Sequence, residues 1–276
     1  MPDIHPTAVI EPGAALAGDV VVGAHSVIGP NVTIGEGSWV GSGAIIEGHT
    51  TIGKHNRIHH QAMIGGEPQD LKYRGETTTL VIGDHNDIRE SVTIHVGTEN
   101  GGGSTTIGSH NLLMIGAHVA HDSHLGDRCI LSNNVLLAGH ITVEDYAVIG
   151  GGTAVTQYVT VGRYAYVGGL SGVVHDCPPF MVSDGHPARV RGVNLIGLAR
   201  HRFDEQAIER LKTAYRMLFG KERVCCSAGL DELEKAHGDE ALIVELCRFV
   251  RRSSQQRHGR HAEQHRRDDK HIAPAR

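Results

Sequence analysis

Residues 107–150 read IGSHNLLMIGAHVAHDSHLGDRCILSNNVLLAGHITVEDYAVIG, and every sixth residue of this stretch is a branched aliphatic. These positions are Ile107, Leu113, Val119, Leu125, Leu131, Leu137, Val143 and Ile149. A six-residue unit is too short for a pair of helices or a propeller blade, but it suits one short strand followed by a turn. The period is therefore typical of a hexapeptide-repeat solenoid.

The same period runs through most of the first 173 residues. The other aliphatic positions are Ile4, Ile10, Leu16, Val22, Ile28, Ile34, Val40, Ile46, Ile52, Ile58, Ile64, then Ile82, Ile88, Ile94, and finally Val155, Val161, Val167 and Val173. Three units make one triangular coil of 18 residues (3 × 6), so we expect about nine stacked coils and a prism on the order of 40 Å long. Prisms of this class are left-handed, against the usual rule for parallel crossovers. A thin aliphatic core agrees with an aromatic content of only 4%.

Two segments interrupt the period. Between Ile64 and Ile82 the phase is kept, but residues 65–73 read as an external loop. Between Ile94 and Ile107 the spacing is 13 residues, so residues 95–106 must bulge out of a coil. Each loop is either a tolerated surface insertion or the wall of a cleft.

The repeat ends at residue 178 and is followed by three expected helices. We predict a β-helix over 1–178, a linker over 179–203, a helical domain over 204–250 and a disordered basic tail over 251–276. Asp204 can cap a helix that ends at Gly220, Leu230 and Leu233 suggest a second helix, and residues 243–250 suggest a third.

Composition excludes several classes of protein. The net charge of −5 and the pI of about 6.5 give no general nucleic-acid signal. The repeat begins at once, so no signal peptide is expected, and no apolar run reaches the length of a membrane span. Five cysteines do not suggest a disulfide framework. A cytoplasmic protein is therefore expected.

The 18-residue coil predicts which residues share a face. Residues just before the repeat aliphatic should point outward, and on one face these form an apolar stripe, which we expect a partner to cover. The stripe consists of Leu112, Ile130, Val148 and Tyr166.

A second column is polar. His121, Gly139 and Gln157 are 18 residues apart, with Asp122, His140 and Tyr158 beside them and His118 near the same edge. Two chemistries fit this column. His121 could act as a general base that Asp122 orients, with the Gly139 N–H holding an oxyanion. Alternatively, the histidines could bind zinc across a subunit interface.

These residues resemble a known family, the acyl-carrier-protein-dependent UDP-N-acetylglucosamine O-acyltransferases of lipid A biosynthesis. The matching stretches are residues 66–73, 88–95, 101–103, 111–114, 117–122, 137–140, 150–151, Gln157, 168–169 and 192–194. The resemblance implies a homotrimer with sites between neighbouring prisms, no metal and no cofactor. It implies transfer of a 3-hydroxyacyl group from acyl carrier protein to the 3-hydroxyl of UDP-N-acetylglucosamine.

The resemblance also implies roles for individual residues. His121 is expected to deprotonate the sugar hydroxyl, supported by Asp122, with the Gly139 amide as oxyanion donor. Gly169 lies where the family sets acyl length, and its missing side chain favours a long chain. The expected substrate-binding residues are Gln69, Asp70, Lys72, His118, His140, Gln157, Asn194 and Arg200.

The chain departs from the family pattern at Thr156, Val96 and His201, where many members carry His, Arg and Arg, and at Ile196, which stands in a segment that lacks a Glu found in some members. These departures affect the expected nucleotide contacts and the periphery of the site, and they leave His121, Asp122 and Gly139 untouched.

Basic residues after the prism are either a docking site for the acidic carrier protein or a solvated charged surface. They are Arg189, Arg191, Arg200, Arg202 and Arg210. The rival functions are a zinc enzyme resembling carbonic anhydrase and an inactive scaffold.

Overall fold

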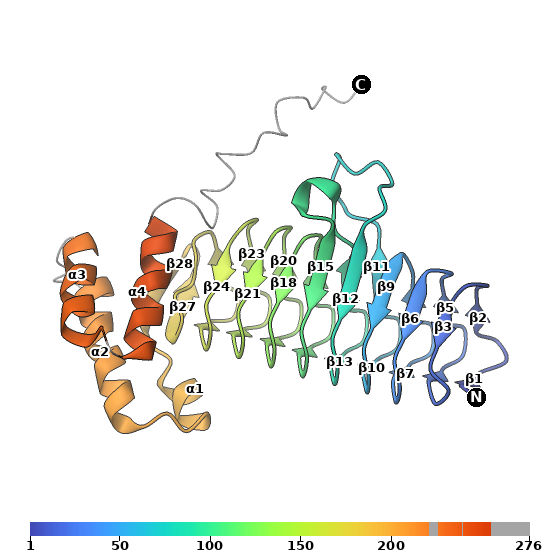
Figure 1. Ribbon diagram of the computed structural model, residues 1–276, viewed down its shortest axis with the longest axis horizontal. Helices are drawn as coiled ribbons and strands as arrows, with labels where there is room; N and C mark the ends of the chain where they lie inside the picture. The colour runs from blue at the N-terminus through green and yellow to red at the C-terminus, as the bar shows by residue number, and fades with distance from the viewer. Residues whose placement is uncertain (221–225, 239, 255–276) are drawn as a thin grey trace.

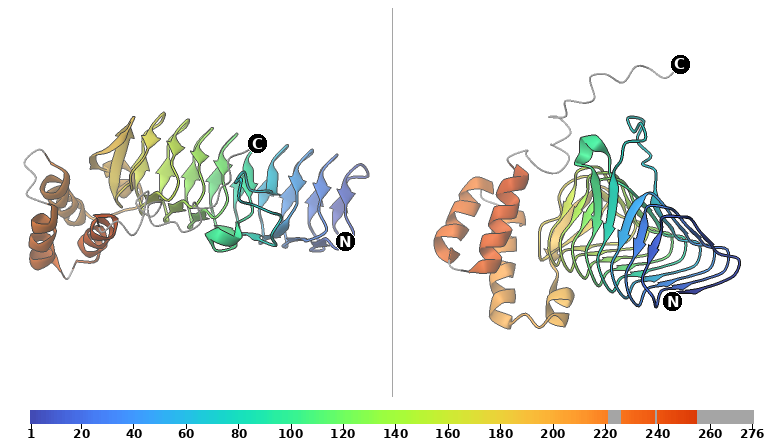
Figure 2. Two further views of the ribbon diagram at one scale, coloured as in Figure 1. Left: turned by 90° about the horizontal axis from the view of Figure 1, so that it is seen from above. Right: turned by 45° about the vertical axis from the view of Figure 1, so that its right-hand side comes forward.

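The computed structural model describes residues 1–220, 226–238 and 240–254, and it shows a triangular prism followed by a helical domain (Figures 1 and 2). Three sheets form the faces of the prism, and successive strands go to sheets A, B and C in turn. The prism is a left-handed parallel β-helix, as the repeat predicts. Its sheets A and B each contribute a strand to nine coils, which agrees with the expected number.

The strands are short, and most contain two residues. Sheet A contains β1 (Asp3–Ile4), β4 (Val21–Val22), β7 (Trp39–Val40), β10 (Arg57–Ile58), β13 (Asp87–Ile88), β16 (Leu112–Leu113), β19 (Ile130–Leu131), β22 (Val148–Ile149), β25 (Tyr166–Val167), β27 (Met181–Gly185) and β28 (Ala188–Val193). Sheet B contains β2 (Val9–Ile10), β5 (Val27–Ile28), β8 (Ile45–Ile46), β11 (Met63–Gly66), β14 (Thr93–His95), β17 (His118–Val119), β20 (Leu136–Leu137), β23 (Ala154–Val155) and β26 (Gly172–Val173). Sheet C contains β3 (Ala15–Leu16), β6 (Val32–Ile34), β9 (His49–Ile52), β12 (Thr79–Ile82), β15 (Ser104–Ile107), β18 (His124–Leu125), β21 (Thr142–Val143) and β24 (Thr160–Val161).

The strand register confirms the 18-residue coil. Leu112 pairs with Ile130, and Ile130 pairs with Val148. Where a loop is inserted, the offset grows, so that Arg57 pairs with Asp87 and Asp87 with Leu112. The repeat aliphatics are buried in one continuous core, except for the partly exposed Ile4, Ile10 and Leu16 of the first coil.

Both insertions leave the prism at the same corner, which we call the B–C corner because it links strands of sheet B to strands of sheet C. The first, residues 67–78, joins β11 to β12. The second joins β14 to β15 and contains the 3₁₀ turn η1 (Glu99–Gly101). The two project side by side from the prism (Figure 1), and a hydrogen bond from Val96 N–H to the Gly66 carbonyl links their bases.

The prism does not end in a plain linker. Residues 179–203, expected to be a linker, contain strands β27 and β28 and helix α1 (Leu195–Arg200). Strand β27 pairs in parallel with β25, and β28 pairs with β27 antiparallel, so sheet A continues past the last coil. The six-residue repeat ends before this hairpin, so the repeat could not predict it.

The helical domain follows the expected pattern. Helix α2 (Glu205–Phe219) begins after its cap Asp204 and ends at Gly220. Helices α3 (Cys226–His237) and α4 (Ala241–Ser254) complete the domain, and the apolar faces of α2, α3 and α4 share a second core. The expected tail begins too early, because α4 continues to Ser254. The rest of that predicted tail, residues 255–276, lies outside the described residues.

Polar contacts fix α4 to the last coils. The Arg163 guanidinium donates to the Glu245 carboxylate, with Nε 2.9 Å from Oε1. Arg252 lies 3.3 Å from Glu144, and the Ser253 hydroxyl lies 2.8 Å from Asp176. Within the part of the chain that the structure describes, no helix is both long and apolar enough to cross a lipid bilayer.

Candidate active site

His121 and Asp122 lie at the B–C corner, in the turn between β17 and β18. Their side chains form a hydrogen bond of 2.7 Å between His121 Nδ1 and Asp122 Oδ2. Both residues are buried. Because Nδ1 is engaged by the carboxylate, Nε2 is left as the nitrogen that can exchange a proton with a substrate.

Asp122 is held as a carboxylate by donors from the second insertion. The Thr98 backbone N–H donates to Oδ1 at 2.8 Å, and the Thr98 hydroxyl donates to Oδ2 at 2.6 Å. Burial alone would raise the pKa of Asp122, but the hydrogen bonds from His121 and Thr98 outweigh burial and lower it. The Asp122 N–H in turn donates to the Thr105 hydroxyl at 2.8 Å.

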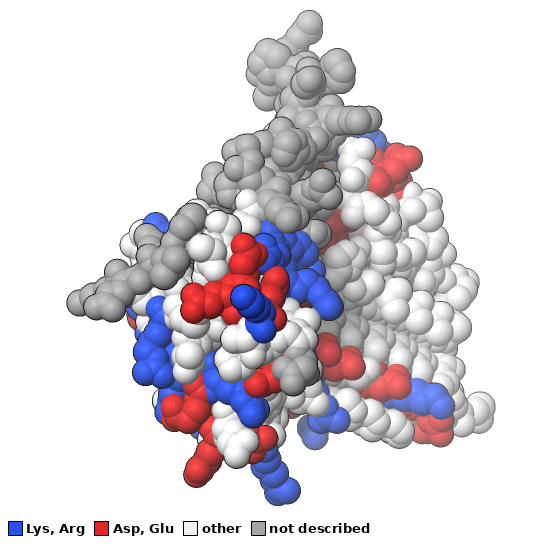
Figure 3. Space-filling model, turned by 60° about the vertical axis from the view of Figure 1, so that its left-hand side comes forward, with Lys and Arg blue, Asp and Glu red and all other residues white. Residues whose placement is uncertain are grey.

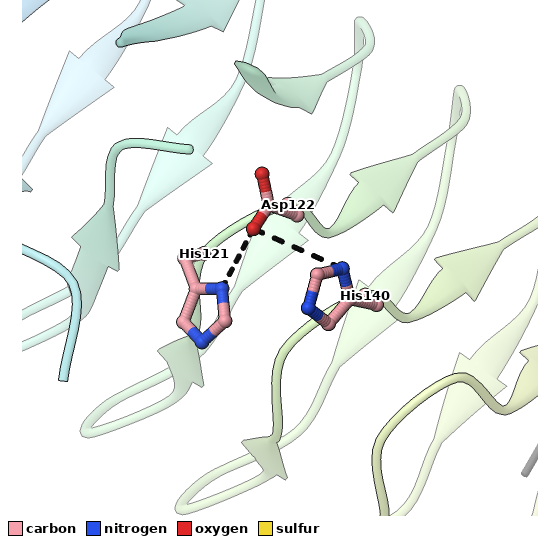
Figure 4. Close-up of side chains that lie close together, drawn as sticks. All are labelled: His121, Asp122 and His140. Carbon is pink, nitrogen blue, oxygen red and sulfur yellow. Dashed lines mark hydrogen bonds and ion pairs between the residues drawn. The ribbon is translucent and has the colours of Figure 1, made fainter. Parts of the chain in front are cut away.

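His140 lies one coil further along the same corner, between β20 and β21. Figure 4 shows both imidazole rings turned toward the Asp122 carboxylate, with His140 Nδ1 3.8 Å from Oδ2. The ring of Tyr158, on the next coil, stacks on His140 with 4.5 Å between centroids. The column predicted from the 18-residue spacing is therefore real for His121, Asp122, His140 and Tyr158.

Gly139 is packed directly against the His121 ring. A Cβ atom at this position would lie 2.6 Å from His121 Cε1 and 2.8 Å from Nε2, well inside ordinary contact. Among the described residues its backbone N–H has no hydrogen-bond acceptor. A buried, unused N–H beside Nε2 of a histidine is suited to bind an oxyanion.

Two further histidines lie beside this group. The ring of His118 contacts that of His95, with centroids 4.8 Å apart, and its Nδ1 lies 2.7 Å from the Thr93 hydroxyl. Burial, followed by the nearby His118 and His121, lowers the pKa of His95 to about 4. Burial also lowers the pKa of His118, with a smaller effect of His121. Both rings are therefore neutral near pH 7.

Sequence reasoning missed His95 and Thr98. Both lie where the 13-residue spacing breaks the register, so the repeat could not place them beside His121. The unequal spacing itself was the available signal, because an insertion at the corner of the polar column must pass over that column. The Nδ1 atom of His95 is buried and has no hydrogen-bond partner in the described residues.

The predicted substrate-binding residues of the first insertion share the corner but do not contact His121 in this chain. Gln69 is exposed, and the Lys72 N–H donates to Asp70 Oδ1 at 2.9 Å. Lys72 Nζ lies 3.9 Å from Asp70 Oδ2. Beneath this loop is a cavity of about 390 Å³, which Val96 helps to line.

The remaining predicted residues are dispersed. Gln157 lies at the B–C corner beside Tyr158, whereas Gly169 lies at the corner between sheets A and B. Asn194 is buried as the cap of α1, where its amide donates to the Tyr164 carbonyl and accepts from the Gly197 N–H. Arg200 is exposed at the end of α1. Figure 1 shows α1 away from the two insertions that mark the B–C corner. Asn194 therefore has a structural role within the chain.

One group could also hold a metal ion. Ligand atoms of His121, Asp122 and His140 lie within 4.8 Å of one another. However, both Asp122 oxygens already accept hydrogen bonds from Thr98, and Oδ2 also bonds to His121. That arrangement fits a carboxylate that orients a histidine better than one that ligates a metal.

Comparison with known proteins points to one family. A family model described as UDP-N-acetylglucosamine O-acyltransferase, domain 2, matches residues 176–259, and a bacterial transferase hexapeptide model matches residues 2–35, 31–66 and 104–139. The UDP-N-acetylglucosamine O-acyltransferase of Moraxella catarrhalis is 40% identical over 91% of this chain and 97% of its own, with a TM-score of 0.86. The UDP-N-acetylglucosamine acyltransferase of Campylobacter jejuni is 38% identical over 90% and 96% (TM-score 0.85), and that of Arabidopsis is 34% identical over 91% and 96% (TM-score 0.79).

Proposed function

Because the chain belongs to the UDP-N-acetylglucosamine O-acyltransferase family, whose reaction is the first step of lipid A biosynthesis, we propose how its own residues carry out that acyl transfer. The acceptor is the 3-hydroxyl of UDP-N-acetylglucosamine, and the donor is a 3-hydroxyacyl thioester of acyl carrier protein. The observation that carries the mechanism is the hydrogen bond between His121 Nδ1 and Asp122 Oδ2.

In the first step His121 Nε2 removes the proton of the sugar hydroxyl, and the resulting oxygen attacks the thioester carbonyl. The carbonyl electrons move to oxygen, and the free N–H of Gly139 stabilises that oxyanion. Asp122 stabilises the imidazolium that forms. In the second step the C–S bond breaks, and the imidazolium returns its proton to the leaving thiolate of the carrier protein. No cofactor is needed for this sequence.

Polar side chains around His121 are suited to bind a sugar. His118 and His140 offer ring nitrogens at the B–C corner, and Gln157 and the loop residues Gln69 and Asp70 offer amide and carboxylate groups. Lys72 adds positive charge beside the cleft. These residues form the proposed sugar-binding set, and their common corner, rather than any contact in one chain, supports that assignment.

A homotrimer completes the site in this proposal. The outward stripe of Leu112, Ile130, Val148 and Tyr166 is in register on sheet A, where Tyr166 is 39% exposed. Such a stripe is suited to packing against another copy. Arg200, which lies away from His121 in its own chain, can contribute to a neighbouring site only through such an assembly.

The carrier protein is proposed to dock on the basic residues that follow the prism. Arg189 and Arg191 are exposed in β28, and Arg200 and Arg202 are exposed at and after the end of α1, whereas Arg210 of α2 pairs with Glu240 at 3.0 Å. Figure 3 shows acidic and basic side chains interspersed on this end of the molecule. We expect higher salt to weaken carrier-protein binding more than sugar-nucleotide binding. Equal salt slopes for the two ligands would argue against this docking site.

Turnover of His121→Ala tests the proposed base. A lost general base costs about 10²–10⁴-fold in rate, while the melting temperature should change little. The assay uses chelator-treated enzyme, 3-hydroxyacyl carrier proteins of several lengths and UDP-N-acetylglucosamine. Near-normal turnover of the variant would refute the mechanism. Turnover that disappears with chelation and returns with zinc would favour a metal at His121, Asp122 and His140 instead.

A further inference from the structure

The second insertion covers Asp122, and the hydrogen bonds from this insertion to the Asp122 carboxylate come from Thr98. Thr98 is buried, with 4% of its surface exposed. It precedes the 3₁₀ turn η1 as its cap, and its carbonyl accepts hydrogen bonds from the Gly101 and Gly103 N–H groups. The turn thus fixes the position of Thr98 over the B–C corner.

Thr98 satisfies the carboxylate from two directions. Its backbone N–H binds Oδ1, and its hydroxyl binds Oδ2, the same oxygen that receives His121 Nδ1. The hydroxyl is itself oriented, because it accepts a hydrogen bond of 3.1 Å from the Gly101 N–H. Its proton is therefore directed toward Asp122.

Gly101 shows how closely the insertion is fitted to Asp122. A Cβ atom on Gly101 would lie 2.0–2.3 Å from the carboxylate atoms, so no other residue fits at this position without displacing Asp122. The neighbouring Gly102 differs, because a Cβ there would have no heavy atom within 4 Å, although its φ of +104° still favours glycine. The loop therefore packs against Asp122 at Gly101 and not at Gly102.

We propose that Thr98 is a positioning residue for the acyl transfer, and that the insertion at residues 96–103 serves to lock the Asp122 carboxylate in the orientation that holds the His121 ring. This inference rests on the proposed role of His121. The N–H and the hydroxyl of Thr98 both donate to Asp122, and the hydroxyl also accepts from Gly101, so Thr98 acts only through Asp122. Without its hydroxyl, Asp122 Oδ2 keeps a single donor, and the carboxylate can rotate away from His121.

Thr98→Val and Thr98→Ser test the hydroxyl. Valine keeps the shape and the backbone N–H but removes the hydrogen bond, and serine restores it. We expect kcat of Thr98→Val to fall roughly 10–100-fold, the range for losing a hydrogen bond to a charged group and slightly misplacing a catalytic group. KM for UDP-N-acetylglucosamine should stay unchanged, and Thr98→Ser should recover most of the activity.

A split between kcat and KM separates positioning from simple packing. If Thr98 orients Asp122, Thr98→Val should lower kcat while KM for the sugar nucleotide and the melting temperature stay close to wild type. Thr98→Ser should restore kcat, because it restores the hydroxyl that donates to Asp122 Oδ2.

Two glycine variants provide a matched pair. Gly101→Ala should reduce kcat at least as much as Thr98→Val, whereas Gly18→Ala, where a Cβ atom meets only the Met1 nitrogen at 3.9 Å, should remain close to wild type. The inference is overturned if Thr98→Val keeps the wild-type kcat, or if Thr98→Ser is as impaired as Thr98→Val. Failure of this inference can be told apart from failure of the proposed base. If only the role of Thr98 is wrong, His121→Ala will still be inactive. If His121 is not the base, His121→Ala will keep its activity.

Discussion

Replacing Gly139 with alanine should remove most of the activity, because the added methyl group would displace the His121 ring. The new methyl carbon would lie 2.6 Å from His121 Cε1, whereas ordinary contact begins near 3.4 Å. The ring or the turn must therefore shift by about 0.8 Å (3.4 − 2.6). Gly139 does not have a left-handed backbone, so the alanine adds no backbone strain and the effect is steric.

A displacement of about 1 Å in a catalytic group can cost on the order of 100-fold in rate. We therefore expect Gly139→Ala to lose about two orders of magnitude in kcat, close to 2.7 kcal/mol in the barrier. The assay follows release of the carrier-protein thiol at saturating sugar nucleotide, together with thermal unfolding.

Gly18→Ala is the matched control in the same prism. A Cβ atom at Gly18 would have only the Met1 nitrogen within 4 Å, at 3.9 Å, so this variant should turn over normally. A Gly139→Ala enzyme within threefold of wild type would mean that His121 tolerates displacement, and the reasoning from its close packing would be wrong.

Three other predictions concern the length of the acyl chain, the packing of α4 on the prism and the dependence of stability on pH. Gly169→Met should shift the preferred donor to a shorter acyl chain, measured with a series of carrier-protein thioesters, and an unchanged preference would remove Gly169 as the length determinant. Glu245→Gln should cost about 0.5–1 kcal/mol by breaking the half-buried pair with Arg163, lowering the melting temperature by about 2 °C, and the difference should shrink in 1 M salt. His95 stays neutral in the folded chain down to pH about 4, while the unfolded chain binds the proton below about 6.5. Stability should therefore fall as pH drops from 6.5 to 4, and His95→Asn should flatten that slope in thermal unfolding.

The sequence was sufficient wherever the period was intact. The 18-residue register alone predicts that His121, Asp122, Gly139 and His140 share one edge, because parallel strands stack identical coil positions. It also located the capped helix α2 from Asp204 and Gly220.

The sequence failed where the period breaks. Thr98 and His95 lie beside His121 and Asp122 in an insertion whose path no repeat specifies. The contact of Asn194 with the nucleotide stays a prediction of the resemblance, and its amide also caps α1 and donates to the Tyr164 carbonyl. Residues 251–254 read as tail because of their charge, but in α4 Arg251 pairs with Asp231 and Glu234, so the helix continues.

The two ends of the prism are closed differently, and that asymmetry predicts where the chain frays. Among the described residues, strands β1, β2 and β3 each have a neighbour on one side only, and their aliphatics Ile4, Ile10 and Leu16 are partly exposed. At the other end the β27–β28 hairpin and the helices cover the stack. In a solenoid each coil is stabilised chiefly by its nearest neighbours, so melting should proceed as a front from the N-terminus. Several coils separate the N-terminal end from His121, so the first coils can unfold without disturbing the site.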